Sequence, residues 1–500
     1  MSDNPPSRHM TILFWMVVAA ALLLFGWGIW SLPLQSHNEA RRLVTLHEML
    51  ATRLWLTPMK NGLFYFEKPP LFYWLGAVVS LVTGSTAEWV LRLPSVLAAL
   101  LTTGLLYRHV RTAMGRHAAL FSALALVGSP FYVTYARRAE INVVFGMLCF
   151  AALVLFFDYL QSSRRRNLYA SFCVLGLASL AKGPVALLFF LAPLIAYGLI
   201  RRERKVFIAL VNPLGWLLFA AIGLSWFAYA LYGIPDSPLR GVIAQDIVGK
   251  SVTAAHDPFY TYLVALLGAF APWILILIYK PRRWLRWPVS PPTLFALCAV
   301  ITPLIIMSGF AAKHPKYMLP VVPFLAALLG GTVSTLYDRA VAAGGHRLPR
   351  VVTWGSAVLL TGLFIFITVA QPRACAYRYI VLKPFAARIH SLQGVHPVYA
   401  YHKEHAQLLL YHGGPMLPVD EHELAEKLTR GESFLLVARD DDTDLAEHAG
   451  LSLLESFSPY LKRNRAGVLY GSAAFCRDLN HAASGDKVSG ITDVLTETAP

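Results

Sequence analysis

The chain has 500 residues, of which 56% are hydrophobic and only 14% are charged. Soluble domains carry about a quarter charged residues, so this composition, with a mean hydropathy of +0.52, excludes an ordinary soluble enzyme and indicates a membrane protein with many crossings. The net charge of +16 suits basic loops at an anionic membrane face. We therefore expect no nucleic-acid partner.

Apolar runs of about bilayer length recur along the first three quarters of the chain. A helix needs roughly 20 apolar residues to cross a membrane, and such runs lie near residues 11–32, 88–107, 117–135, 141–160, 167–181, 183–200, 206–232, 259–279, 290–311, 317–337 and 351–371. The first run lacks a small-residue cleavage site, so we expect a permanent helix there. Another run, 69–84, follows Pro69-Pro70 and is short for a crossing.

The distribution of lysine and arginine decides whether 69–84 crosses. If it lies flat on the surface, one side of the membrane receives Arg8, Arg108, Arg111, Arg116, Arg164, Arg165, Arg166, Arg201, Arg202, Arg204, Lys205, Lys280, Arg282, Arg283, Arg286, Arg339, Arg347 and Arg350. Positive residues favour the cytoplasmic side. We therefore predict eleven crossings plus one interfacial helix, with the chain from residue 372 outside the cytoplasm.

This topology places the polar loops together on the outer face. They are residues 33–87, 136–140, 182–184, 233–258 and 312–316. The opposite face holds mainly basic anchors. Such an asymmetry is what an extracytoplasmic active site would produce.

The composition changes after the last crossing. Short strands are predicted at 398–401, 433–438 and 467–470, and an amphipathic helix at 421–430. We therefore expect a membrane domain at 1–371, with 33–87 as its large outer loop, and a small extracytoplasmic α/β domain at 372–481. The composition of 482–500 indicates a disordered tail.

Two segments of the large outer loop carry candidate site residues. Glu67-Lys68 lies between aromatic residues and Pro69-Pro70, at a membrane boundary, which suits binding of an anionic lipid head group. Upstream, leucines recur every three or four residues from Leu43 to Leu54, which predicts an interfacial amphipathic helix. At its start, Asn38 and Glu39 are site candidates; alternatively, Asn38 only caps the helix and Glu39 only favours its dipole.

Charged and polar residues also mark the outer ends of later spans. Glu140 and Asn142 lie where the fourth span enters apolar surroundings, and ionisable groups there are functional candidates. Further basic side chains at outer ends are Lys182, His256, Lys313 and Lys316. Each alone is an ordinary anchor, but together with Lys68 they could neutralise a phosphodiester, because a low-dielectric site strengthens each contact.

Several stretches occur in the order found in one family. They are Asn38-Glu-Ala-Arg-Arg42, Glu48-Met-Leu50, Asn61-Gly through Glu67-Lys-Pro-Pro-Leu71, Arg92-Leu-Pro-Ser95, Arg138-Ala-Glu-Ile141, Ala181-Lys-Gly-Pro184, His256-Asp-Pro-Phe259 and Tyr317-Met-Leu-Pro320. This combination resembles the GT-C type membrane glycosyltransferases, specifically the bacterial relatives of aminoarabinose–lipid A transferases and protein O-mannosyltransferases. The resemblance covers about residues 10–330, and the Glu-Lys-Pro-Pro motif is its most specific part.

The resemblance implies a polytopic α-helical protein of the bacterial inner membrane, with a small α/β domain in the periplasm. It implies an undecaprenyl-phosphate or other polyprenyl-phosphate sugar as donor, with inversion at the anomeric carbon. The acceptor is lipid A, another envelope glycan or a protein. The donor phosphate would be bound by Lys68, Arg41, Tyr65, Lys182, Lys313 and Tyr317. Relatives can hold a divalent cation, for which Glu67 and His256 offer half a site; no other cofactor is expected.

Two asparagines depart from the family pattern. Relatives usually have an aspartate at the position of Asn38, and often another at Asn142. An asparagine cannot act as general base, so either Glu39 or Glu140 takes this role or the acceptor is already nucleophilic, such as a phosphate. We favour Glu39 as base, with Asn38 orienting the acceptor. Two other classes stay open: a protein that binds lipid-linked sugar without transferring it, and a transporter, which would show broken helices at mid-membrane.

Overall fold

The computed structural model describes residues 8–235, 237–244, 257–271, 273–274, 289–345, 347–373, 382–402, 406–439, 450–461 and 465–485. The chain divides into two compact units. The helical unit comprises Met1–Leu32, Thr45–Met59 and Phe64–Pro372; the sheet unit comprises Pro33–Val44, Lys60–Leu63 and Arg373–Pro500. Boundaries between the two units fall within helix α2 (His37–Thr52) and within the hairpin of β1 (Met59–Lys60) and β2 (Leu63–Phe64).

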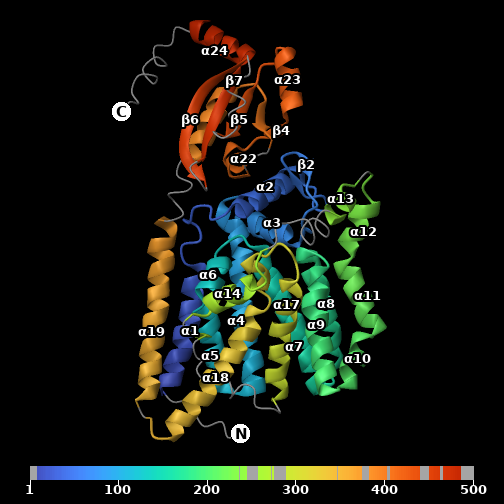
Figure 1. The fold of residues 1–500 in the computed structure, drawn as a ribbon, viewed down its shortest axis with the longest axis vertical. Coiled ribbons are helices and arrows are strands. Elements are labelled where there is room, and N and C mark those ends of the chain that lie inside the picture. The colour runs from blue at the N-terminus through green and yellow to red at the C-terminus, as the bar shows by residue number, and fades with distance from the viewer. Residues whose placement is uncertain are drawn as a thin grey trace. The chain divides into compact units, whose positions relative to one another are not determined.

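The helical unit is a bundle (Figure 1). Its helices are α1 (Arg8–Gly26), α3 (Leu71–Thr83), α4 (Glu88–Met114), α5 (Arg116–Val127), α6 (Pro130–Ala136), α7 (Ile141–Ser162), α8 (Arg165–Lys182), α9 (Val185–Arg201), α10 (Arg204–Leu210), α11 (Pro213–Gly223), α12 (Ser225–Tyr232), α13 (Leu239–Ala244), α14 (Thr261–Ala269), α17 (Pro291–Ser308), η2 (Pro315–Met318), α18 (Val322–Ala342), α19 (Leu348–Ile365) and η3 (Phe366–Ala370).

Among the described residues, five helices are long and apolar enough to cross a membrane. They are α1, α4, α7, α17 and the stretch Leu348–Arg373. Two bent pairs, α5–α6 at 65° and α10–α11 at 47°, pass the same test together and raise the number to seven. The predicted count of eleven is not confirmed, and part of the predicted crossing at 259–279 lies outside the described residues.

Proline and a preceding cap explain both bends. Ser129 Oγ accepts a hydrogen bond from the Tyr132 N–H, and Pro130 begins α6. Asn212 caps α11 in the same way, and Pro213 follows it. Because proline has no N–H and suits only the first turn of a helix, each sequence starts a new helix instead of continuing the old one.

Helix α3 has the length expected of an interfacial helix. Its 13 residues span about 20 Å, against about 30 Å for the hydrocarbon core of a bilayer. It begins directly after Pro69-Pro70 and ends at Gly84, whose φ of 67° is left-handed. One face buries Phe72 and Tyr73, while Val82 near its end is 80% exposed.

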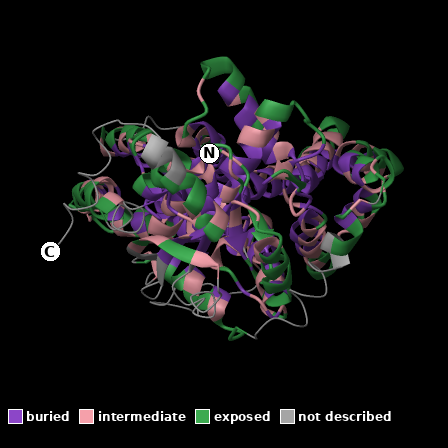
Figure 2. Cartoon of the chain, turned by 90° about the horizontal axis from the view of Figure 1, so that it is seen from above, coloured by how far each residue is buried: buried purple, intermediate pink, exposed green. Residues whose placement is uncertain are grey.

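Small residues allow the bundle helices to approach closely. A Cβ at Gly330 of α18 would lie 2.1 Å from Ser122 Oγ of α5, and one at Gly176 of α8 would lie 2.9 Å from Ile222 Cβ of α11. Between Ala118 and Val127 every residue of α5 is buried; buried residues are purple in Figure 2. This is the packing expected where apolar contact and small residues join membrane helices.

The sheet unit contains one five-stranded sheet with helices. Its elements are α21 (Leu382–Gln393), β3 (Val398–Tyr401), α22 (Ala406–His412), β4 (Leu417–Val419), α23 (Glu421–Thr429), β5 (Leu435–Arg439), β6 (Leu451–Leu461), β7 (Arg465–Ser472) and α24 (Ala473–Gly485). The strand order is β4-β3-β5-β7-β6; β3 is parallel to β4 and β5, and β7 is antiparallel to β5 and β6. Strands occur at all three positions where the sequence predicted them, and α23 lies at the predicted helix.

Side chains of β5 alternate between two cores. Leu435 and Val437 join a cluster with residues of α21 and α22. Phe434 and Leu436 join another cluster, which includes Leu424 of α23. Successive strand side chains point to opposite faces, so helices on both faces bury the apolar residues 435–438 of β5.

The buried His412 predicts that the sheet unit loses stability in acid. Its ring is 5% exposed, and neither ring nitrogen has a hydrogen-bond partner among the described residues. Burial, and then the neighbouring His390, lower the pKa of His412. The folded unit therefore binds this proton less readily than the unfolded chain, and stability present above pH about 6.5 falls as the pH drops below it.

Hydrogen exchange of the full chain, corrected for intrinsic rates, measures this effect. Between pH 7 and pH 5.5 the amides of α22 and β3 should lose protection, and His412→Gln should reduce the loss. His422→Gln is the control, because His422 is exposed. Equal acid sensitivity in the wild type and His412→Gln contradicts the prediction.

Candidate active site

A tight hairpin precedes the Glu-Lys-Pro-Pro motif. Strands β1 (Met59–Lys60) and β2 (Leu63–Phe64) pair across Asn61 and Gly62, whose φ values are 59° and 74°. Two left-handed residues form the type I′ turn that Asn-Gly favours. Within the sheet unit, the Asn61 amide also donates to Met416 O and accepts from Met416 N–H, at 2.7 and 2.8 Å. The Asn-Gly sequence therefore favours this turn, and the Asn61 side chain also holds it through its hydrogen bonds to Met416.

The residues after the hairpin hold the motif against the helical unit. Tyr65 Oη donates to Glu67 Oε2 at 3.1 Å, and Lys68 Nζ donates to the Glu67 carbonyl at 2.6 Å. Phe66 is buried, with its ring 5.8 Å from that of Trp226 in a cluster that includes Leu180 of α8. An aromatic anchor thus sets the position of the charged pair beside it.

Lys182 stands at the end of α8. Gly183 has a φ of 94°, its N–H bonds to Ser179 O at 2.6 Å, and Pro184 follows. Glycine accepts this conformation without strain, and the chain turns directly into α9. The sequence Lys-Gly-Pro therefore places the lysine side chain at a helix end.

The Lys182 ammonium lies over two aromatic rings and among other charges. Its Nζ is 4.3 Å from the ring centre of Tyr317 and 5.0 Å from that of Phe145. It also interacts electrostatically with Lys68, Glu140 and Lys316. We call Lys68, Lys182 and Lys316 the lysine cluster.

Close packing of η2 on α7 holds Tyr317 in place. A Cβ at Gly146 would lie 3.2 Å from both the Leu319 carbonyl carbon and Pro320 N. The His314 ring lies 5.3 Å from the Tyr317 ring in an edge-on arrangement. The missing side chain at Gly146 therefore lets the segment that carries Lys316 and Tyr317 lie directly on the helix beside Lys182.

Glu140 serves as the cap of α7. Its Oε1 accepts hydrogen bonds from the backbone N–H and the side-chain Nδ2 of Asn142. Its own N–H donates to Ser95 Oγ at 3.0 Å. Glu140 and Asn142 are each 3% exposed. Both are thus brought near the lysine cluster through Lys182, with Glu140 oriented by Asn142.

Lys313 has a different environment from the cluster lysines. Its Nζ donates to the carbonyls of Asp257 and Phe310, at 2.8 and 2.6 Å, and its N–H donates to Asp257 Oδ2. The residue is 6% exposed. The sequence analysis assigned this ammonium to the donor phosphate, but these bonds already use it. We therefore propose that Lys313 stabilises its loop instead.

Asn38, Glu39 and Arg41 belong to the sheet unit. Asn38 Oδ1 accepts from Arg41 Nη2 at 2.7 Å. Glu39 is 0% exposed, and its Oε2 accepts the Gln35 N–H at 2.8 Å. Neighbouring helical residues point about 100° apart, so Glu39 does not occupy the position of Asn38. This geometry disfavours our hypothesis that Glu39 replaces the missing aspartate as base.

The metal hypothesis finds only one of its two ligands among the described residues. The Glu67 carboxylate accepts the Tyr65 hydroxyl, while His256 lies outside the described residues. Among the residues that are described, no group of three His, Cys, Asp or Glu side chains is arranged to hold a metal ion. One carboxylate is not a binding site, and we derive no step through a metal.

The sequence analysis gave no role to three supporting residues, although Arg92 and Ser95 belong to a stretch that it compared with the family. Ser95 fixes the backbone of Glu140, Phe145 lies beneath Lys182, and Arg92 donates to the carbonyls of Ile29 and Leu32 at 2.7 and 2.8 Å. Arg92 is 0% exposed inside α4. Only Arg92 had a clear signal, because an arginine within an apolar span is costly unless it is paired.

Known proteins resemble the chain in both sequence and fold. The family described as dolichyl-phosphate-mannose-protein mannosyltransferase matches residues 67–232. The undecaprenyl phosphate-alpha-4-amino-4-deoxy-L-arabinose arabinosyl transferase of Aeromonas salmonicida is 27% identical over 72% of this chain and 65% of its own. An uncharacterized protein of Aquifex aeolicus is 34% identical over 43% of this chain and 49% of its own. The chain thus spans about half to two thirds of these relatives.

Solved structures show the fold. The crystal structure of ArnT from Cupriavidus metallidurans bound to undecaprenyl phosphate matches with a TM-score of 0.76 and 20% identity, over 91% of this chain and 97% of that one. The chain therefore shares the fold of this protein. The oligosaccharyltransferase AglB of Archaeoglobus fulgidus matches at 0.54 and 12% identity, over 92% of this chain and 74% of that one. These matches confirm the resemblance inferred from the sequence.

Replacing Lys313 should weaken the fold of the helical unit. Lys313→Met leaves the part-buried carbonyls of Asp257 and Phe310 without their donor, at a cost of roughly 1 kcal/mol or more. Arg166→Met is the control, because Arg166 is exposed. Thermal unfolding in detergent, followed by tryptophan fluorescence, should show a lower melting temperature for Lys313→Met than for the control. Equal melting temperatures in the two variants contradict this prediction.

Proposed function

We propose that the chain is a glycosyltransferase that binds the phosphate of a polyprenyl-phosphate sugar at the lysine cluster. The observation that carries this proposal is the environment of Lys182. Its ammonium rests on two aromatic rings near Lys68 and Lys316, and within the described part of the chain no carboxylate forms an ion pair with it. Ammonium groups held together repel one another, and an anion relieves that cost.

The same charges suit the departure of the phosphate. An acceptor oxygen attacks the anomeric carbon while the bond from that carbon to the phosphate oxygen breaks, and the electron pair leaves with the polyprenyl phosphate. Fixed positive charges stabilise the negative charge that develops on the leaving oxygen. The rings of Phe145 and Tyr317 hold Lys182 by cation–π contact without neutralising it.

The burial of Glu39 favours an acceptor that needs no base. A phosphate oxygen is ionised at neutral pH, so positioning becomes the main requirement. Arg41, which donates to Asn38, is the type of side chain that pairs with phosphate. The relatives named as aminoarabinosyl transferases support an aminoarabinose-type sugar, and we propose a phosphate-bearing acceptor such as lipid A. Other envelope glycans and proteins rank behind it.

We place the lysine cluster on the periplasmic side of the bacterial inner membrane, together with residues 372–481. Support comes from the opposite ends of the helices, where Arg108, Arg164 and Arg201 lie at or beside the ends of α4, α8 and α9. Positive residues favour the cytoplasmic side, so the ends that carry Lys182 and Glu140 are assigned to the periplasm.

Lys182→Met should lower kcat/KM for transfer by about tenfold to a hundredfold, since a charged hydrogen bond contributes roughly 1.5–3 kcal/mol. The assay uses purified full-length protein, radiolabelled polyprenyl-phosphate aminoarabinose and lipid A. Lys427→Met is the control, because Lys427 pairs with Glu432 on the sheet unit. Wild-type kcat/KM in Lys182→Met refutes the cluster as the donor site. Donor binding without any transfer would identify a silent binding protein instead.

The acceptor hypothesis makes a separate prediction. If an ionised phosphate attacks, Glu39→Gln should not alter the pH dependence of kcat, although it can lower stability because the Gln35 N–H loses a carboxylate partner. Asn38→Asp should lower activity, because the new carboxylate would pair with Arg41. This ion pair would neutralise the charge that we assign to binding phosphate. Loss of an acidic limb of the pH profile in Glu39→Gln, or a gain of activity in Asn38→Asp, would restore the general-base mechanism.

A further inference from the structure

A second polar site lies at the ends of α7 and α8 that are opposite to Glu140 and Lys182. It is a cavity of about 470 Å³ between the last turn of α4, the last turns of α7, the start of α8 and the start of α17. Glu140 and Lys182 lie at the opposite ends of α7 and α8. The cavity is therefore separate from the candidate active site.

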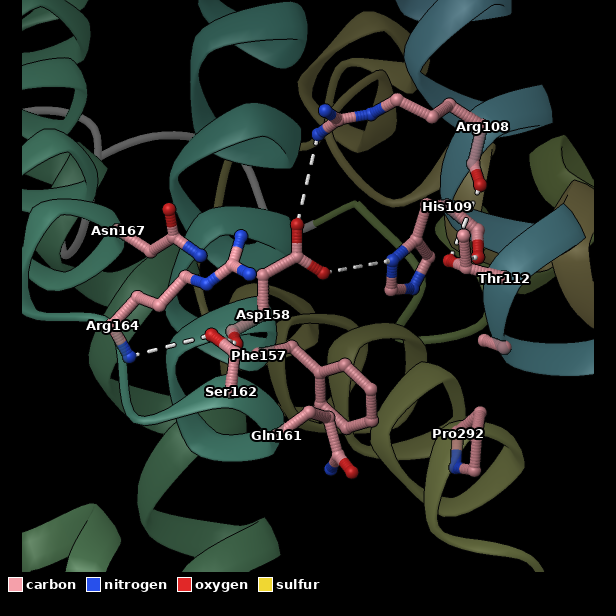
Figure 3. A pocket seen from close by; sticks show the side chains of 11 residues that line it. Arg108, His109, Thr112, Phe157, Asp158, Gln161, Ser162, Arg164, Asn167 and Pro292 are labelled. Atoms are coloured by element: carbon pink, nitrogen blue, oxygen red, sulfur yellow. Dashed lines mark hydrogen bonds and ion pairs between the residues drawn. The ribbon is translucent and has the colours of Figure 1, made fainter.

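Four charged or titratable side chains line the cavity. Figure 3 shows the Asp158 carboxylate between the Arg108 guanidinium and the His109 ring. Arg108 Nη2 is 3.6 Å from Asp158 Oδ2, and His109 Nδ1 is 4.0 Å from Asp158 Oδ1. Arg164 and Asn167 line another wall. Both contacts are within ion-pair distance but longer than a hydrogen bond, so Asp158 is held only loosely by its two neighbours.

The hydrogen-bonding capacity of these groups is largely unused. Among the described residues, none donates a hydrogen bond to the Asp158 carboxylate, and the buried Nδ1 of His109 has no partner. His109 is only 7% exposed and packs edge-on against Phe157, at 5.6 Å between ring centres. A half-buried carboxylate is stabilised by a cation that carries several hydrogen-bond donors. The exposed arginines suit the binding of an anion.

An apolar stripe leads along α4 to the cavity. Leu97 and Leu101 are 48% and 56% exposed, and Gly104 and Arg108 continue the exposed face at intervals of three and four residues. In a membrane such a stripe contacts acyl chains, and an arginine at its end extends toward the head groups. The stripe therefore offers an apolar surface for the acyl chain of a lipid.

We propose that this cavity binds the head group of an aminophospholipid from the leaflet at this end of the helices. The lipid ammonium lies at Asp158, its phosphate pairs with Arg108 and Arg164, and an acyl chain follows Leu101 and Leu97 along α4. A zwitterionic head group offers a partner to both the Asp158 carboxylate and the guanidinium groups, whereas a purely anionic one leaves the carboxylate without a cation from the lipid. The inference stands on the described geometry and does not depend on the proposed transferase activity.

Native mass spectrometry of delipidated full-length protein tests this proposal. The protein is titrated with dioleoylphosphatidylethanolamine or dioleoylphosphatidylglycerol in detergent. We expect one tightly bound phosphatidylethanolamine and a preference over phosphatidylglycerol. Asp158→Asn should abolish the preference, and Arg108→Gln with Arg164→Gln should weaken binding about tenfold, as for the loss of a charge-assisted hydrogen bond.

The control carries Arg111→Gln and Arg166→Gln, which remove two exposed neighbours that do not line the cavity. Its affinity should match the wild type, and melting temperatures identify any variant that fails to fold. Equal binding of both lipids by the wild type overturns the aminophospholipid assignment. Unchanged affinity in a folded Arg108→Gln, Arg164→Gln protein overturns the site.

Discussion

The proposed site depends on an ammonium group with which, in the described part of the chain, no carboxylate forms an ion pair. At Lys182 the chain does this with a glycine of positive φ that ends α8, a proline that starts α9, and two aromatic rings beneath the cation. Aromatic faces attract a cation but leave its hydrogen-bond donors available. A paired carboxylate would stabilise the same lysine better and would compete with a phosphate for it. In the proposed function the arrangement therefore gives up some stability for anion binding, which is the usual cost of a functional site.

The contrast between Lys182 and Lys313 shows how the same residue type serves two purposes. Lys313 donates to two carbonyls within hydrogen-bond distance and is nearly inaccessible. Its charge is used to close a loop, since backbone carbonyls that lack a donor are costly when buried. Lys316, three residues later, contributes instead to the charge around Lys182. In this loop Lys313 therefore has a structural role, whereas Lys316 belongs to the proposed site.

Much of this organisation could be predicted from the sequence, because it follows from local patterns. Helix-ending Lys182-Gly183-Pro184, the apolar spans and the strands around 398–401 and 467–470 are all set by short-range chemistry. Lys313 and Lys316 could not be separated in this way, because which lysine meets carbonyls depends on how the loop folds onto Asp257. The position of Glu39 could have been predicted: it is four residues before Leu43, so helical periodicity places it on the buried stripe.

The burial of Glu39 and the asparagine at position 38 lead to the same conclusion about the acceptor. A carboxylate acts as general base only where it can reach the proton that it removes, whereas Glu39 is sealed and accepts a backbone N–H. Asn142, the other departure from the family pattern, donates to Glu140 and fixes it as a helix cap. Both substitutions replace a potential base with a group that orients its neighbour. Such a change is tolerable when the acceptor arrives already ionised, because the catalytic requirement then shifts from proton transfer to holding two phosphates in position against their mutual repulsion. Fixed cations meet that requirement, and in the proposed reaction the lysine cluster supplies them.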